Sequence, residues 1–338
     1  MTDTPSPEQL APEQLIGALT ESRAARRRFL LGASRTGLAL GTVALLDACG
    51  GSDSGTATPT PTDTTTATPS PTATSVIIDQ NALNFLINIE YLTAQFYAAA
   101  TATPLAASLL TGTGVQGAVV GGHAVTFTDP LVGQYARELA ADDLAHVGFL
   151  RSLLGSQVVA QPAINIDGGA SGAFTTAMLG AGVITSGTFD PYASDENFLL
   201  AAYFLTDVAV TAYKGAGLLF TDQIRLNAVA GIMATEAYHA GLLRTTLYAK
   251  GATTPALRTN ADLISNYRDS LDGTTDLDQG ITGTATASNI TPADANGFAF
   301  TRTAGQALNI FYLNHAAVVG GGFFPNGMNG VTITSAAS

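Results

Sequence analysis

Residues 81–100, with the sequence NALNFLINIEYLTAQFYAAA, carry the pattern that decides the fold. Apolar side chains recur there every three or four residues, at Leu83, Leu86, Ile89, Leu92 and Phe96. That spacing matches the turn of an α-helix and predicts a helix with one apolar stripe facing a core. Glu90 lies on the same stripe, so we expect a carboxylate to point into the core.

Three further segments repeat this period, at about residues 131–154, 196–219 and 222–248. The last two are joined almost directly, which makes them antiparallel neighbours. About 40 residues separate the second segment from the third. The order predicts an all-α four-helix bundle over residues 77–251, with one long crossover between helices 2 and 3. Residues 252–338 are expected to form a C-terminal extension packed on the bundle.

Two carboxylate–histidine pairs fall on these helices, Asp143-x-x-His146 and Glu236-x-x-His239. Residues three apart share one face of a helix, so each pair can reach a single metal ion. A lone buried histidine or glutamate is more often only hydrogen-bonded. Together with Glu90, however, five such residues recur on three helices, which favours a metal site. Asp142 stays an alternative to Asp143.

Several motifs resemble the ferritin-like domain family that includes desiccation-related proteins. The resemblance spans about residues 76–330, and its motifs are NFLINIEYL at 84–92, HVGFLR at 146–151, TAYKGA at 211–216, EAYHA at 236–240, DLDQGI at 276–281 and GGGFFPNG at 320–327. It implies a ferritin-like bundle with a dimetal site, in which two helices each give a Glu and two each give a Glu-x-x-His. The ligands carried over are Glu90, Asp143, His146, Glu236 and His239.

The third helix departs from the family pattern. Thr206 stands where the resemblance implies a glutamate, and Asp207 is about 100° around the helix. One metal position therefore lacks its terminal carboxylate. The expected cofactor is iron or manganese, as one or two ions.

Composition excludes some partners. The chain has 14 Lys+Arg against 26 Asp+Glu, a net charge of −12 that repels nucleic acid. A single cysteine in 338 residues rules out an intramolecular disulfide. A homo-oligomer is left open by the sequence.

The N-terminal region indicates export. Arginines at 26–28 precede a short apolar run at 37–46, which is typical of a twin-arginine signal and too short to span a membrane. We assign residues 1–48 to this signal segment and residues 49–76, rich in Ser, Thr and Pro, to a disordered tether. Cys49 follows Leu46-Asp47-Ala48 and is a candidate for lipidation, although Asp47 is atypical there. We expect a protein of the periplasm or cell envelope that meets the membrane only through a lipid anchor at Cys49.

Two functions follow. The first is an exported ferritin-like protein with an incomplete metal site, linked to stress or desiccation as the resemblance implies. The alternative is a dimetal oxidoreductase of ferroxidase or catalase type, against which the threonine at 206 argues.

Overall fold

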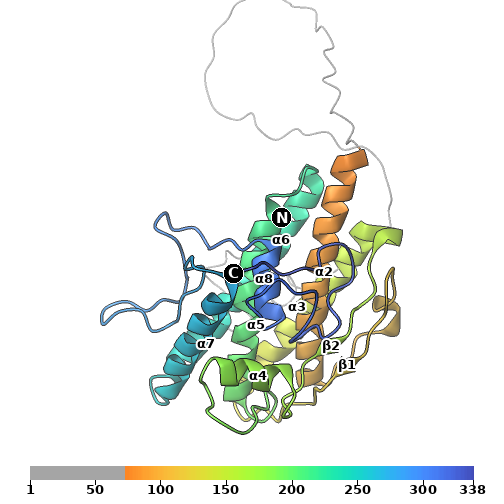
Figure 1. Cartoon of the computed structure of the whole chain (residues 1–338). Coiled ribbons are helices and arrows are strands. Elements are labelled where there is room, and N and C mark those ends of the chain that lie inside the picture. The colour runs from red at the N-terminus through yellow and green to blue at the C-terminus, as the bar shows by residue number, and fades with distance from the viewer. Residues whose placement is uncertain (1–72) are drawn as a thin grey trace, which may run out of the picture. The chain divides into compact units, whose positions relative to one another are not determined.

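The computed structural model describes residues 73–338 and confirms the all-α bundle. Its four long helices are α2 (Ala73–Thr101), α3 (Pro130–Leu154), α5 (Asp195–Gly217) and α6 (Gln223–Lys250) (Figure 1). Helix α2 begins at Ala73, inside the stretch assigned to the tether. The signal segment, Cys49 and most of the tether lie outside the described residues. None of the helices in residues 73–338 is long and apolar enough to cross a membrane.

Polar caps set the start of the bundle helices. Asp129 caps α3 by accepting from the backbone N–H group of Leu131, and Asp222 caps α6 by accepting from those of Ile224 and Arg225. Helix α5 is capped by Ser194. The neighbouring Asp195 instead accepts from the backbone N–H groups of Thr128 and Asp129, which ties the start of α5 to the start of α3.

The two long connections pair with each other. The segment between α2 and α3 contains the short strand β1 (Val119–Val120), and the crossover from α3 to α5 contains β2 (Ile164–Asn165) and α4 (Ala173–Gly180). Strands β1 and β2 are parallel, with Val119 opposite Ile164. The first connection therefore forms no hairpin of its own but lies against the crossover.

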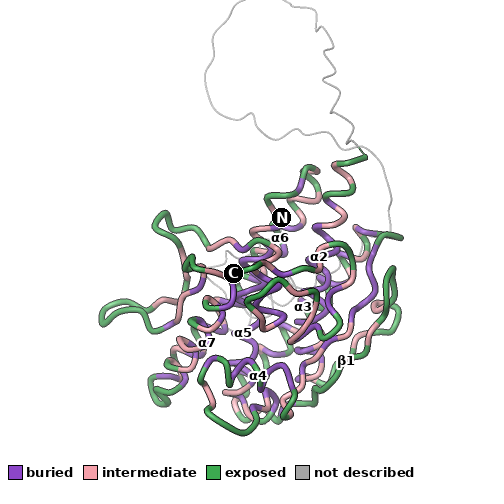
Figure 2. Tube along the Cα trace, in the orientation of Figure 1, coloured by how far each residue is buried: buried purple, intermediate pink, exposed green. Residues whose placement is uncertain are grey.

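The C-terminal extension changes which faces of the bundle are buried. It contains α7 (Ala256–Asp272) and α8 (Ala304–Phe311), which contact α5. Every residue from 82 to 94 in α2 and from 198 to 213 in α5 is buried, whereas α3 and α6 keep exposed faces (Figure 2). The predicted apolar stripe of α2 is buried, and surrounding segments cover the other faces of this helix as well.

A network of buried ion pairs fastens the extension to the bundle. Arg244 on α6 and Arg268 on α7 both donate to Asp207 Oδ2 on α5, over 2.7 and 2.9 Å. Asp278 accepts from Arg268 over 2.7 Å and from Arg302 over 3.0 Å. Arg302 also pairs with Asp272, so three arginines face three aspartates. These charges compensate one another, which is the condition for burying them. Asp207 therefore lies off the bundle axis, as its position one residue after Thr206 predicts.

Candidate metal centre

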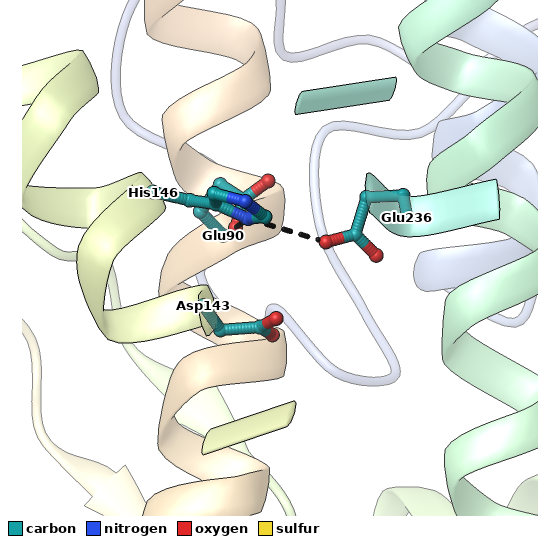
Figure 3. A group of neighbouring side chains, drawn as sticks. All are labelled: Glu90, Asp143, His146 and Glu236. Atoms are coloured by element: carbon teal, nitrogen blue, oxygen red, sulfur yellow. Dashed lines mark ion pairs between the residues drawn. The ribbon is translucent and has the colours of Figure 1, made fainter. Parts of the chain in front are cut away.

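Four side chains from three helices meet inside the bundle. Glu90 comes from α2, Asp143 and His146 from α3, and Glu236 from α6 (Figure 3). One ligand atom from each lies within 4.8 Å of all the others. The three carboxylates are at most 2% exposed and His146 is 9% exposed. The cluster is therefore almost fully enclosed by protein.

Histidine nitrogens and carboxylate oxygens in this cluster face a common centre at ion-pair distances, without the geometry of hydrogen bonds. His146 Nδ1 lies 3.3 Å from Glu90 Oε2 and 3.3 Å from Glu236 Oε1. Among the described residues, the buried polar atoms without a hydrogen-bond partner include Glu90 Oε2, both Asp143 oxygens, His146 Nδ1, Glu236 Oε1 and His239 Nδ1. Buried polar atoms are nearly always partnered. A cation bound among Glu90, Asp143, His146 and Glu236 would give partners to the atoms of these four residues. Carboxylate oxygen with imidazole nitrogen is a donor set that suits iron, manganese or zinc.

His239 extends the cluster towards α6. Its Nδ1 lies 3.4 Å from Glu236 Oε1 and 3.7 Å from Asp143 Oδ1, so it faces the same centre from the other side. Its second ring nitrogen, Nε2, lies 3.3 Å from Asp142 Oδ2. The structure thus places Asp143 inside the cluster and Asp142 behind His239, which assigns different roles to the two adjacent aspartates.

Two tyrosines complete the surroundings, and sequence analysis gave neither a role. The Tyr213 hydroxyl on α5 donates to Glu90 Oε1, so that oxygen is satisfied by protein while Oε2 faces the centre. The Tyr97 hydroxyl lies 2.9 Å from Thr206 Oγ1. Thr206 is 1% exposed, and its oxygen is a neutral group bound to Tyr97. The cluster has one half around His146 and another around His239, and the two are unequal as a result. Only the half with His146 has a carboxylate of its own, that of Glu90.

Burial and mutual charge shift the pKa of every ionisable group in the cluster. Burial raises the pKa of Glu90, and burial together with the charge of Glu236 raises that of Asp143 well above its usual range. Burial also opposes ionisation of Glu236, but the two histidines beside it, His146 and His239, outweigh burial and lower its pKa to about 2. Against its own burial, His146 is held protonated by Glu90 and Glu236, with a pKa of about 11. Protons thus neutralise the metal-free cluster, and a metal ion would take their place.

Comparison with known proteins gives the same picture of the fold. A family model described as the ferritin-like domain matches residues 78–249. A ferritin-like catalase, Nec2, of Nesocodon mauritianus is 25% identical, covering 75% of this chain and 84% of its own length. The desiccation-related protein PCC13-62 of Craterostigma plantagineum is 29% identical, covering 68% of this chain and 76% of its own length. No solved structure matches the chain significantly.

Proposed function

Because the chain belongs to the ferritin-like domain family, we propose that its bundle binds one divalent metal ion tightly, iron or manganese, and a second ion weakly. Glu90, Asp143, His146 and Glu236 would hold the first ion. The observation that supports this best is the set of buried, unpartnered ligand atoms facing one centre. Leaving such atoms unsatisfied costs folding free energy, so a bound ion explains an arrangement that protein contacts alone do not.

The inequality of the two halves supports binding of one ion in preference to two. The second position would have His239 Nδ1 and would share Glu236 and Asp143 with the first. A terminal carboxylate supplies both negative charge and a coordination bond, whereas the Thr206 hydroxyl is neutral and already bound to Tyr97. The second ion is therefore expected to bind much more weakly than the first.

Metal analysis of the purified full chain tests this proposal. After incubation with iron(II) or manganese(II) and removal of loosely bound ions, we expect close to one equivalent per chain. His146→Ala should abolish tight binding, while His123→Ala is the matched control because His123 is exposed and pairs with Asp190 at 3.0 Å. Two tightly bound ions would refute the inequality. A chain that retains no metal, and whose melting temperature a chelator leaves unchanged, would overturn the metal site.

A second candidate function is dimetal oxidation chemistry of ferroxidase or catalase type. It is favoured by His239 Nδ1, which faces the same centre, and by the relative named a ferritin-like catalase. Glu90, Asp143, His146, Glu236 and His239 would hold the two ions, which would supply redox chemistry towards oxygen or peroxide. Oxygen release from hydrogen peroxide, measured at saturating manganese, tests this function. We expect little or no turnover, and sustained turnover by the unmodified chain would make this the better proposal.

Export and lipidation belong to the same proposal. The arginines at 26–28, the apolar run at 37–46 and the single cysteine at 49 support a protein of the cell envelope, with a stress or drying role suggested by the desiccation-related relative. Intact-mass analysis of protein from its native host should show a chain that begins at Cys49 with added lipid mass. A mature chain that still begins at Met1 would contradict export.

A further inference from the structure

A cavity of about 390 Å³ lies between α5, α6 and residues 277–302 of the C-terminal extension. Its walls include Val210 from α5, Ala240 and Gly241 from α6, and Pro292 and Phe300 from the extension. The volume lies within the range of small-molecule sites, which are mostly apolar with a few polar groups. None of the proposed metal ligands lines it, so it is distinct from the metal centre.

The charged residues that line the cavity are electrically balanced. They are Arg244, Arg302, Asp207 and Asp278, and they belong to the buried ion-pair network. The Arg244 guanidinium is fully used, because it also donates to the Tyr203 hydroxyl and to backbone carbonyls of residues 279, 280, 289 and 290. An anion would meet the two aspartates and a cation would meet the two arginines. A charged ligand would therefore gain little here and would lose its hydration.

Asp207 retains one oxygen for a ligand. Its Oδ2 accepts from both Arg244 and Arg268, and neither arginine donates to its Oδ1. The residue is 7% exposed and lines the cavity. A carboxylate oxygen that lines a mostly apolar cavity and receives no hydrogen bond from these arginines favours a partner that brings a donor. The remaining walls are mostly apolar and offer few partners to water.

We propose that this cavity binds a neutral small molecule with an apolar body and one hydroxyl or N–H group, which donates to Asp207 Oδ1. The apolar body would pack against Val210, Ala240 and Phe300. Neither the metal nor its ligands take part, so the site is independent of the proposed metal binding.

Gly241 offers a way to block the cavity. A shallow groove outside it shares Ala237, Gly241, Ile290 and Thr291 with the cavity, which places Gly241 where the two meet. A Cβ atom built on Gly241 meets no atom within 4 Å. Gly241→Leu should therefore fit the helix and fill this junction. Gly231 on α6 is equally open and lines neither space, so Gly231→Leu is the matched control.

Isothermal titration of the full chain with benzyl alcohol tests the proposal, with benzylamine and benzoate as charged analogues of the same size. We expect saturable binding of one benzyl alcohol per chain. Each charged analogue should bind at least roughly tenfold more weakly than benzyl alcohol. Gly241→Leu should weaken binding of benzyl alcohol by roughly tenfold or more, and Gly231→Leu should leave it unchanged.

Three outcomes would overturn the proposal. The first is that benzyl alcohol shows no saturable binding. The second is that benzoate or benzylamine binds as tightly as benzyl alcohol. The third is that Gly241→Leu binds benzyl alcohol as tightly as the parent chain does. Melting temperatures of both leucine variants verify that they fold. Leucine has a higher helix propensity than glycine, so neither variant should be less stable than the parent chain.

Discussion

The Thr206 hydroxyl on α5 lies 2.9 Å from the Tyr97 hydroxyl on α2, and both side chains are at most 1% exposed. This contact occupies the place where a fourth helix would give the cluster another carboxylate. Because the hydroxyl is engaged by Tyr97, it is not among the unpartnered atoms that face the centre. The unequal halves of the site follow from this single position.

Thr206→Glu should raise the metal content from close to one equivalent towards two. The new carboxylate would supply the charge and the coordination bond that the second position lacks, at the cost of the contact with Tyr97. Metal analysis after removal of loose ions measures this. Thr206→Val is the control, because it keeps the shape and removes only the hydroxyl, and its metal content should equal that of the parent chain. A glutamate variant that folds and still retains one ion would contradict the explanation.

Metal binding should strengthen as pH rises. In the metal-free chain the pKa of His146 is about 11 and that of His239 about 10, so both rings are protonated at neutral pH. A metal ion must displace those protons, and release of one or two protons raises the affinity by about 10- to 100-fold per pH unit. Competition with a chelator of known affinity, repeated from pH 6 to pH 8, measures the slope. A flat profile would show that the histidines do not bind the metal.

The same pKa shifts give the stability of the metal-free chain the opposite pH dependence, so that it falls as pH rises. The pKa of each histidine is raised above its unfolded value of 6.5, so its stabilisation is complete below that pH and is lost as pH rises through about 10 to 11. The gain in melting temperature on adding metal should therefore be larger at pH 8 than at pH 6. An equal gain at both pH values would contradict this linkage.

The bundle and its crossover could be predicted because apolar periodicity and helix spacing are local features. The four helices lie where the period places them, and the family resemblance is confirmed by the match over residues 78–249. The ligand assignment stays a prediction, although all five residues lie around one centre. Spacing along a helix was enough to place each carboxylate–histidine pair on one face of that helix. Only the packed structure shows that these faces of α2, α3 and α6 point towards one another.

The parts that sequence analysis missed depend on contacts far apart in the chain. Asn88 on α2 donates to the carbonyl of Asn329, a residue 241 positions later, and no local pattern announces such a pair. The burial of all faces of α2 and α5 has the same origin. Helical geometry could place Asp207 off the bundle axis, next to Thr206. It could not predict the ion pairs of Asp207, because their partners come from α6 and α7.

The buried ion-pair network predicts a stability effect that is independent of metal. Asp278→Ala removes one partner each from Arg268 and Arg302, which keep only Asp207 and Asp272 respectively. Three buried arginines then face two aspartates, and the uncompensated positive charge costs about 3–5 kcal/mol. Urea unfolding of the metal-free chain measures the loss. Asp276→Ala is the control two residues away, since Asp276 is exposed, and it should leave the unfolding midpoint unchanged. Equal midpoints for the two variants would show that the network does not hold the extension in place.

The last prediction separates the adjacent aspartates on α3. Asp142 is not aimed at the centre, and its Oδ2 lies 3.3 Å from His239 Nε2, the nitrogen that faces away from the other ligands. A carboxylate there keeps the proton on Nε2 and the lone pair on Nδ1, which fixes the ring for metal binding. Asp142→Ala should leave binding of the first ion unchanged and weaken binding of the second ion, which depends on His239. We expect this affinity to fall by about 10- to 100-fold in the Thr206→Glu background, where the second ion can be measured.

Two further variants act as controls. Asp142→Asn should restore part of the affinity, because its amide oxygen can still accept from Nε2. Glu138→Ala, which removes an exposed carboxylate one turn earlier on the same helix, should change neither ion. If Asp142→Ala removed the first ion as well, Asp142 would be a ligand of the cluster, and if it changed neither ion, the contact with His239 would have no role in metal binding.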